Sequence, residues 1–422
     1  MIRRFLTLAS WLTAGVLLIF TVRRWLFILA ALPATIPFGT PFGTPFGRRA
    51  DRRPPTADGV LSAHNRLSDL PALLLLAPIR NEAETLPGLL ATLAALDYPA
   101  DKLTGVLIND GSTDESEKII ESWIKGRDNW RLLSLAQNVG KAQGLNSALA
   151  AFPQGEIVAV YDADERPQPP ALRYLVSPFS GEKIGGVTGR RAVSNPLVSP
   201  AASYTTFEGL VHQWVTLRAK DRLNLAPAIL GANCAYRRTA LAEVGNFEPG
   251  ALLEDSDLTL KLARAGWTIR FEPRAVSYHR VPQTLAGYWR QHTRWARGFN
   301  EVAKNQARST LAGPQLSWPL RLELLAFSLG YLDRLALLAG VGLALLHPQR
   351  RKFLLTVVAA SLLTPLFQIM AALTIGREPA AMWLRIIWLP FFFGVDMAMA
   401  AAGMWQTLKQ SPQIWEERRV RK

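Results

Sequence analysis

Two aspartates separated by one residue follow a short apolar run, and their chemistry suits a divalent cation. The run is Ile157–Val160, and Asp162 and Asp164 come just after it. Both carboxylates can turn into a crevice where the chain leaves a buried strand, and such hard oxygen ligands suit Mg²⁺ or Mn²⁺. A cation held there would neutralise the charge that builds on a departing diphosphate. Taken alone, a triplet of this kind is more often part of a solvated loop.

A third aspartate ends another apolar run. Asp110 lies in the sequence Ile-Asn-Asp-Gly-Ser-Thr-Asp at 108–114, where a glycine turn and a Ser/Thr pair that can cap a helix follow it. One interpretation places Asp110 on the base or ribose of a nucleotide. Ordinary turn chemistry, with the carboxylate bonding its own backbone, accounts for the same residues.

A pair of acidic residues precedes the helical pattern at 258–265. Glu254 and Asp255 favour a helix start because the helix dipole attracts negative charge there. The functional alternative makes Asp255 a general base that removes a proton from an attacking hydroxyl.

An amide, a guanidinium and an indole lie within five residues at 291–295. Arg294 and Trp295 have the chemistry to bind a pyrophosphate and to stack on a sugar ring, with Gln291 beside them. A second interpretation lets Trp295, together with Tyr288 and Trp289, anchor a helix at a membrane surface.

The elements that carry these residues follow an α/β pattern. Apolar runs at 73–77, 106–108 and 157–160 alternate with helical stretches, which predicts a mostly parallel sheet flanked by helices. Ligands of such sheets gather at the carboxyl ends of the strands, where the polar residues above are found.

Hydrophobic blocks flank this α/β region. Residues 5–22, 353–375 and 386–408 are long and apolar enough to cross a bilayer, although a signal peptide is the alternative for the first. The block 322–346 carries Glu323, Asp333 and Arg334, and neighbours on a helix point in different directions, so Asp333 and Arg334 should not easily neutralise each other. We expect that block to be interfacial or re-entrant, giving three full spans, with four as the alternative.

Charge supports a membrane protein with its catalytic region in the cytosol. The formal charge is +15 while 49% of residues are hydrophobic, which favours basic loops beside anionic lipid over a nucleic-acid binder. Basic clusters at 350–352 and 418–422 should both face the cytosol. Cys234 is the sole cysteine, which excludes an intramolecular disulfide and a multi-cysteine zinc site.

These features divide the chain into five predicted parts. They are an N-terminal transmembrane segment at 1–35, a Pro/Gly/Arg-rich linker at 36–70, a catalytic domain at 71–315, interfacial and transmembrane helices at 316–410, and a basic tail at 411–422.

The order of the motifs resembles that of the family 2 glycosyltransferases, which include cellulose, chitin, hyaluronan and poly-N-acetylglucosamine synthases. The motifs are Asn-Asp-Gly-Ser-Thr-Asp, then Asn-Val-Gly-Lys at 138–141, then Asp-Ala-Asp, then Leu-Glu-Asp, then Gln-His-Thr-Arg-Trp. The resemblance covers residues 71–300. Each motif is weak by itself, but all five in this order are specific.

The resemblance implies a GT-A fold and an inverting, single-displacement transfer of a sugar from a cytosolic nucleotide sugar, expected to be a UDP-sugar. Leu253 replaces the threonine of the family's Thr-Glu-Asp motif, which leaves Asp255 intact as the expected base. The implied assignments are Asn81, Glu82, Asp110, Lys141 and Asp162 for the donor, Asp162 and Asp164 for Mg²⁺ or Mn²⁺, Glu254 and Asp255 for catalysis, and Gln291, Arg294 and Trp295 for the acceptor and pyrophosphate.

Alternatives remain for the acceptor and the activity. The Gln-x-x-Arg-Trp motif and the C-terminal spans favour a polymerase that elongates a β-linked glycan for export, with secretion subunits as possible partners. The alternatives are a transferase that adds one sugar to a lipid, and a silent partner of a secretion complex. An inverted-repeat transporter is excluded because the spans are too few.

Overall fold

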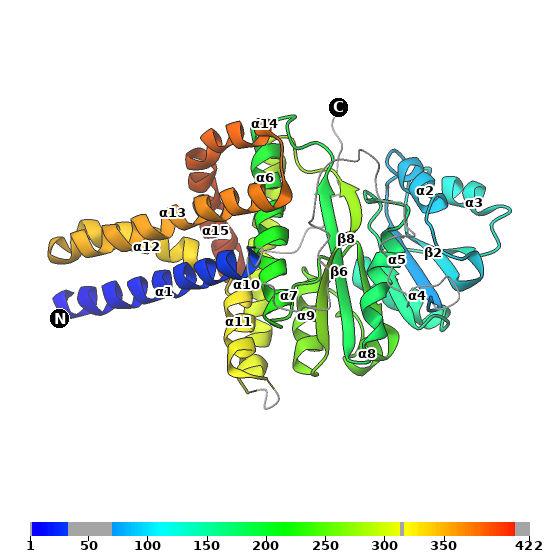
Figure 1. The fold of residues 1–422 in the computed structure, drawn as a ribbon, viewed down its shortest axis with the longest axis horizontal. Coiled ribbons are helices and arrows are strands. Elements are labelled where there is room, and N and C mark those ends of the chain that lie inside the picture. Colours follow the sequence, from blue (N-terminus) through cyan, green and yellow to red (C-terminus); the bar gives the residue numbers. More distant parts are fainter. Residues whose placement is uncertain (1, 33–69, 313–315, 410–422) are drawn as a thin grey trace, which may run out of the picture.

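The structure, a computed structural model, describes residues 2–32, 70–312 and 316–409. An α/β domain forms one end of the molecule and a group of long helices forms the other (Figure 1). Of the predicted linker only Leu70 falls within the described residues, and the predicted basic tail lies outside them.

One eight-stranded sheet organises the α/β domain. Its order is β3-β2-β1-β4-β7-β6-β8-β5. The strands are β1 (Leu73–Ile79), β2 (Leu103–Asp110), β3 (Trp130–Leu135), β4 (Ile157–Val160), β5 (Arg166–Pro167), β6 (Ile184–Val193), β7 (Cys234–Arg237) and β8 (Thr268–His279). The half from β3 to β4 is parallel, as predicted, whereas β7 is antiparallel to both of its neighbours. The sheet is therefore mixed.

The three predicted strands are present. The run 157–160 coincides with β4, while β1 and β2 extend further than the apolar runs, because the parallel ladder continues from Leu73↔Leu103 to Ile79↔Asn109. Asp110 is consequently the last residue of its strand, paired with Leu135 of β3.

Side chains of β1 separate the two halves of the core. Leu74 and Leu76 are buried on one face against α4 (Lys141–Ala151), and Leu73 and Leu75 on the other against α2 (Leu86–Ala94). Full burial of each such leucine contributes roughly 1.5–3 kcal/mol, so both faces of the strand are strongly held. The remaining helices of this domain are α3 (Ser116–Ile124), α5 (Ala171–Val176), α8 (Arg238–Glu243) and α9 (Glu254–Arg264).

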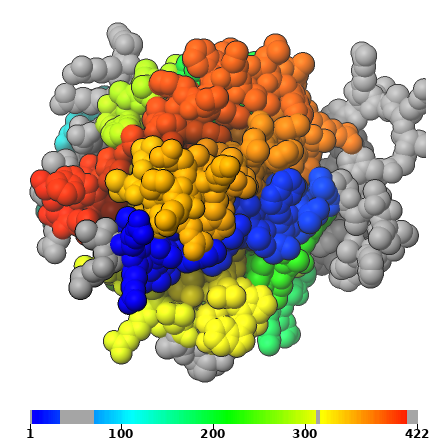
Figure 2. Space-filling model, turned by 90° about the vertical axis from the view of Figure 1, so that its left-hand side faces the viewer, coloured from blue at the N-terminus to red at the C-terminus, as the bar shows by residue number. Residues whose placement is uncertain are grey.

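Three helices lie side by side in the helical part. They are α1 (Ile2–Ala31), α12 (Leu332–Leu346) and α13 (Arg351–Gly376). Figure 2 looks onto their far end, where the blue surface of α1 adjoins the orange surface of α12 and α13. Ring contacts of Trp11 with Phe353 and of Trp25 with Phe367 show that α1 and α13 run in the same direction.

The candidate membrane spans agree with the predicted blocks. Within the described residues, the helices Arg3–Ala31, Pro348–Gly376 and Ala380–Leu408 are long and apolar enough to cross a bilayer. The fourth block is broken, because α11 (Trp318–Ser328) and α12 meet at a bend of 70°. That bend agrees with the prediction that this block is not a simple span.

Charges in the fourth block are neutralised, contrary to the sequence argument. Nη1 of Arg334 lies 3.1 Å from Oδ1 of Asp333, and Arg24 of α1 also pairs with Asp333. Glu323 is paired with Arg23, with 2.7 Å between their charged atoms. The prediction about Asp333 and Arg334 was wrong because it ignored both the reach of an arginine and partners from other helices.

The basic cluster at 350–352 lies at the opposite end of α1 from the α/β domain. His347 contacts Thr7, and the guanidinium of Arg350 lies 4.5 Å from the ring centroid of Trp11. A helix of the length of α1 extends about 45 Å. The prediction that this cluster shares a side of the membrane with the catalytic domain is therefore wrong for an α1 that crosses the bilayer.

A further layer of helices lies between the sheet and the three helices α1, α12 and α13 (Figure 1). It comprises α6 (Pro200–Leu210), a π-helical segment η5 (Val211–Leu217), α7 (Arg218–Arg222), α10 (Leu285–Ala312), α14 (Ala380–Leu384) and α15 (Leu389–Leu408). The helices α10 and α15 pack closely, because a Cβ at Gly403 would lie 2.8 Å from the Cβ of Ala296.

Candidate active site

Lys141 joins two of the acidic motifs. Its Nζ lies 2.8 Å from Oδ1 of Asp162 and 3.0 Å from Oε1 of Glu254, and it donates a hydrogen bond of 2.9 Å to the carbonyl of Gly231. Burial alone would lower the pKa of Lys141, but the two carboxylates outweigh it and the pKa is raised. The predicted donor residue Lys141 is therefore a fixed positive charge between the predicted metal pair and the predicted catalytic pair.

Asp110 holds the loop that presents Lys141. Its two carboxylate oxygens accept hydrogen bonds from the backbone N–H groups of Val139, at 2.7 Å, and Gly140, at 3.0 Å. Gly111 allows this approach, because it has a φ of +62° and a Cβ there would lie 2.6 Å from the nitrogen of Asn138. The structure thus gives Asp110 a role in shaping the site, and its predicted contact with a nucleotide stays a prediction.

Asn81 and Glu82 belong to a loop that docks on the end of β2. The side-chain oxygen of Asn81 accepts a hydrogen bond of 2.7 Å from the N–H of Thr113. The N–H of Glu82 donates to Oγ of Ser116 at 3.0 Å, and its carboxylate accepts from Thr85. The carboxyl ends of β1 and β2 therefore carry one continuous polar rim.

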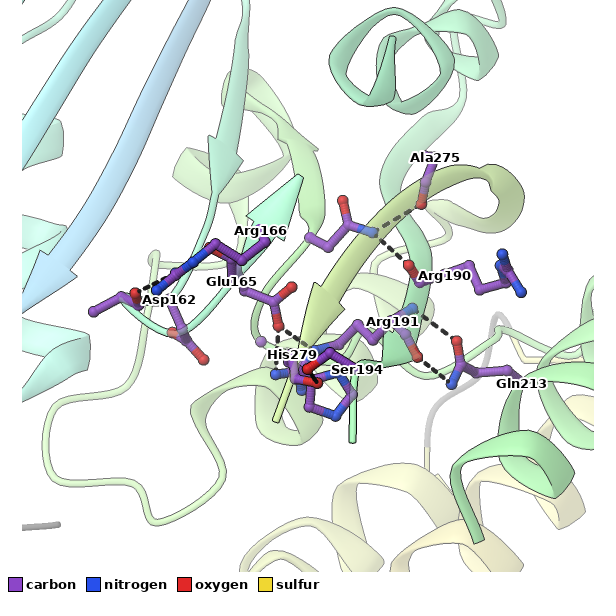
Figure 3. A network of polar contacts seen from close by, with 12 residues as sticks. Asp162, Glu165, Arg166, Arg190, Arg191, Ser194, Gln213, Ala275 and His279 are labelled. Carbon is purple, nitrogen blue, oxygen red and sulfur yellow. Dashed lines mark hydrogen bonds and ion pairs between the residues drawn. The ribbon is translucent and has the colours of Figure 1, made fainter. Parts of the chain in front are cut away.

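A buried ion pair holds the turn that carries the two predicted metal ligands. Asp162 and Asp164 are half-buried, whereas the next residue, Glu165, is fully buried and lies 2.6 Å from the guanidinium of Arg191 (Figure 3). Burial raises the pKa of Glu165, and Arg191 opposes that rise. Arg166 also ties this turn to the first loop, because its guanidinium donates to the carbonyl of Thr85 at 2.6 Å.

The donor set of the predicted metal site is small. Among the residues that the structure describes, three or more His, Cys, Asp or Glu side chains nowhere gather in a way that would hold a metal. Asp162 and Asp164 offer hard oxygens suited to Mg²⁺ or Mn²⁺, which often takes one or two carboxylates together with substrate phosphates. These residues fit a cation that arrives with a diphosphate.

Asp255 lies in the first turn of α9, where its Oδ1 accepts a hydrogen bond of 2.6 Å from the N–H of Ser256. Burial and the negative charge of Glu254 raise the pKa of Asp255 to about 6, while Lys141 opposes the rise. At neutral pH the carboxylate is mainly ionised and more basic than an ordinary aspartate. This is the state that a general base requires.

The helix that bears Gln291, Arg294 and Trp295 packs on the turn before Asp255. A Cβ at Gly298 of α10 would lie 2.6 Å from Cγ of Leu253, so the helix and the turn are in close contact. Trp295 packs against the core that contains Leu253, while Arg294 is exposed. The structure thereby brings all five motifs to one edge of the sheet.

Sequence reasoning missed three features of this site. It assigned no role to the carbonyl of Gly231, to the buried pair of Glu165 and Arg191, or to the histidines. His292 lies 2.8 Å from Glu208 and stacks on Tyr288 with 3.8 Å between ring centroids. No local pattern links partners so far apart in the chain, although Glu165 follows the Asp-Ala-Asp triplet directly.

Cys234 is buried in β7, as expected of a small hydrophobic residue. Burial raises the pKa of its thiol to about 12. The thiol is thus protonated and unreactive at neutral pH.

Known proteins resemble the chain along the α/β domain. A sequence model of the family described as "Glycosyltransferase like family 2" matches residues 71–298. The probable glycosyltransferase YdaM of Bacillus subtilis is 32% identical over 240 residues, which is 56% of this chain and 57% of that protein. The poly-beta-1,6-N-acetyl-D-glucosamine synthase of Staphylococcus epidermidis is 30% identical over 259 residues, 61% of each chain. The chain thus matches about three fifths of the length of these relatives.

A solved structure resembles the whole fold. It is the mannosyltransferase PcManGT from Pyrobaculum calidifontis, in complex with GDP-Man and Mn²⁺. The TM-score is 0.63 at 20% identity, with 98% of this chain and 100% of that chain covered. At this identity the likeness establishes a GT-A-like fold, and its coverage includes the candidate spans.

Proposed function

This chain belongs to the family 2 glycosyltransferases, and we propose that it is an inverting enzyme that moves a sugar from a UDP-sugar to an acceptor hydroxyl. The observation that carries the proposal is Lys141, whose ammonium contacts both Asp162 and Glu254. Through Lys141, the pair Asp162 and Asp164, which suits the metal and diphosphate of a donor, lies next to the pair Glu254 and Asp255, which suits removal of a proton from an acceptor. A glycosyl transfer requires both functions.

On the donor side, Asp162 and Asp164 would hold Mg²⁺ or Mn²⁺, which supplies positive charge to the departing diphosphate. Lys141 contributes a second positive charge at the same edge. Asp110 keeps Lys141 in place through Val139 and Gly140, while Asn81 and Glu82 form the rim on which a nucleotide would lie.

On the acceptor side, Asp255 would take the proton of the attacking hydroxyl. The hydroxyl oxygen forms a bond to the anomeric carbon as the bond to the diphosphate breaks, and the electron pair leaves with the nucleoside diphosphate. Attack opposite the leaving group inverts the anomeric centre. Glu254 helps by making Asp255 more basic, and it is itself paired with Lys141.

The acceptor that we propose is a growing β-linked glycan. Support comes from the Staphylococcus epidermidis relative, which is a polysaccharide synthase, and from the contact between α10 and the turn before Asp255. The candidate spans next to the α/β domain support transfer at a membrane surface, and we propose that the domain lies on the cytoplasmic side of the cell membrane. Gln291, Arg294 and Trp295 would then contact the acceptor or the pyrophosphate.

The test is transfer by the purified full chain from radiolabelled UDP-glucose, UDP-N-acetylglucosamine, UDP-galactose and GDP-mannose, with product size read by gel filtration. We expect one UDP-sugar to give long products that disappear in the Asp255→Asn variant. Transfer from none of the four donors would contradict the proposal. A product carrying one added sugar would contradict chain elongation and identify a single-addition transferase.

A further inference from the structure

A small pocket lies where the sheet meets the helices of the membrane part. Its volume is about 200 Å³. Its polar lining comes from Arg190 and Arg191 of β6, Thr206 of α6, Gln213 and Trp214 of η5, Tyr278 of β8, and Glu378 just after α13. Figure 3 shows Arg191 between Asp162 and Arg190, and Arg191 itself belongs to the lining of the pocket.

Two polar donors at this pocket are buried without a partner. Nε of Arg190 and Nε1 of Trp214 make no hydrogen bond within the described part of the chain. Leaving buried N–H groups in this state costs free energy, and such groups in a native protein call for a ligand or water that satisfies them. The guanidinium lies 5.4 Å from the centroid of the indole ring, so the two donors belong to one wall.

Glycine at position 376 keeps the space next to the second donor open. A Cβ at Gly376 would lie 2.8 Å from Nε1 of Trp214 and 3.2 Å from Oε1 of Glu378. Any side chain there would fill the gap between an indole donor and a carboxylate acceptor. The end of α13 is thus shaped to leave space between these two groups.

The charges of the lining select a neutral ligand that both donates and accepts hydrogen bonds. Glu378 would repel a phosphate and Arg190 would repel a cation, while the charge of Arg191 is already paired with Glu165. A sugar hydroxyl can donate to the carboxylate while others accept from Arg190 and the indole. The volume is below the roughly 300–1,000 Å³ of pockets for drug-sized ligands, which suits a single ring.

The pocket is joined rigidly to the candidate active site. Gln213 accepts a hydrogen bond of 2.8 Å from the N–H of Arg191 and donates one of 2.9 Å to its carbonyl. The side chain of Arg191 in turn holds Glu165, next to Asp164. The π-helical turn that carries Gln213 and Trp214 is of a kind often found at functional sites.

We propose that this pocket binds one neutral sugar unit of the acceptor glycan, at a distance from the unit that receives the new sugar. The inference rests on the proposed function, but binding of a glycan to the pocket does not require turnover. The pocket would hold the glycan between the transfer site and the membrane helices. It would act on acceptor affinity and leave donor affinity unchanged.

Binding of three probes to the purified full chain tests this. The probes are the β-1,6-linked N-acetylglucosamine tetramer, chitotetraose and cellotetraose, titrated calorimetrically without donor. We expect saturable binding of at least one, weakened about tenfold by Trp214→Phe and by Glu378→Ala, each of which removes one hydrogen-bonding group. The affinity for UDP should not change. Trp267→Phe is the matched control, because that indole donates to Glu243 outside the pocket.

Several results would overturn the proposal. They are the absence of saturable binding of all three probes, wild-type affinity in both pocket variants, and displacement of a bound probe by inorganic phosphate. Thermal unfolding of each variant shows whether it is folded, and Trp214→Phe keeps an aromatic side chain at this position. If the donor panel gives no transfer while the pocket variants lose binding, the proposed function fails and the pocket stands. If elongation is normal while probe affinity is unchanged in the pocket variants, the pocket proposal fails and the proposed function stands.

Discussion

Gly231 and Asp255 approach each other so closely that a Cβ at position 231 would lie 2.8 Å from Oδ2 of the aspartate. The same glycine has a φ of +71° and gives its carbonyl to Lys141. Position 231 therefore touches both Asp255, the expected base, and Lys141, whose positive charge sets the electrostatic environment of that base. A substitution at position 231 should therefore affect the rate of transfer more than the stability of the fold.

Gly231→Ala should lower kcat by roughly tenfold to a hundredfold, because the added methyl displaces the carboxylate from its place. Gly245→Ala is the matched control. That glycine also has a positive φ, +84°, but a Cβ there would meet nothing within 4 Å. Both variants should lose some thermal stability from backbone strain. Equal kcat in the two variants would show that contact with Asp255 is unimportant.

Asp255→Asn should abolish transfer while UDP binding stays nearly intact, since an amide keeps the shape but cannot take a proton. Positioned bases contribute about 10² to 10⁴ in rate. Steady-state transfer and equilibrium UDP binding are the two measurements. Turnover above about a tenth of wild type would exclude Asp255 as the base.

Lys141→Met should move the acidic limb of the pH profile of kcat/KM upward by roughly one unit. The positive charge of Lys141 favours the ionised form of Asp255, whose pKa is about 6, so removing it raises that pKa. More acid form is then present at any given pH, and activity is lost at a higher pH. Lys261→Met removes a charge from α9, where Lys261 pairs with Asp257, and should leave the limb in place. An unmoved limb in Lys141→Met would contradict this coupling.

Activity should require Mg²⁺ or Mn²⁺, and Asp164→Ala should weaken UDP binding chiefly when the cation is present. The physical reason is that the aspartate pair binds the nucleotide through the metal. UDP titrations with Mn²⁺ and with EDTA measure the difference. Full activity in excess EDTA would remove the metal from the mechanism.

A cysteine at position 349 should be labelled from outside intact cells by an impermeant reagent. Gln349 is exposed and lies in the turn whose His347 contacts Thr7, at the far end of α1 from the catalytic domain. A Cys234→Ser background removes the native thiol, and Asp128→Cys in the catalytic domain is the control that should stay unlabelled. The opposite labelling pattern would place both sites on the other faces of the membrane.

Sequence reasoning named candidate residues for the chemistry but not the contacts between them. Asp162, Asp164 and Asp255 stood out because they belong to motifs that recur in a known order, which turn and capping chemistry alone would not produce. The bridge that Lys141 makes depends on how α4 is placed against α9, which no local pattern reports. The strands β3 and β5 to β8 were not predicted.

The membrane part failed for a different reason. A rule based on loop charge places Arg350 in the cytosol, whereas aromatic contacts of α1 with α13 place it at the distal end. Asp333 was judged by its neighbour in sequence, but its environment includes Arg24 from a helix about three hundred residues earlier in the chain. In both cases the outcome depends on residues that are distant in sequence but close in the fold.

The ammonium of Lys141 has a consequence for the order in which ligands arrive. Because Lys141 already pairs with Asp162 and Glu254, a cation that enters alone gains little, whereas a diphosphate that enters without a cation meets the negative charges of Asp162 and Asp164. Each ligand therefore improves the affinity for the other, by the same factor in both directions. We therefore expect the site to bind a nucleotide together with a cation more tightly than either ligand alone.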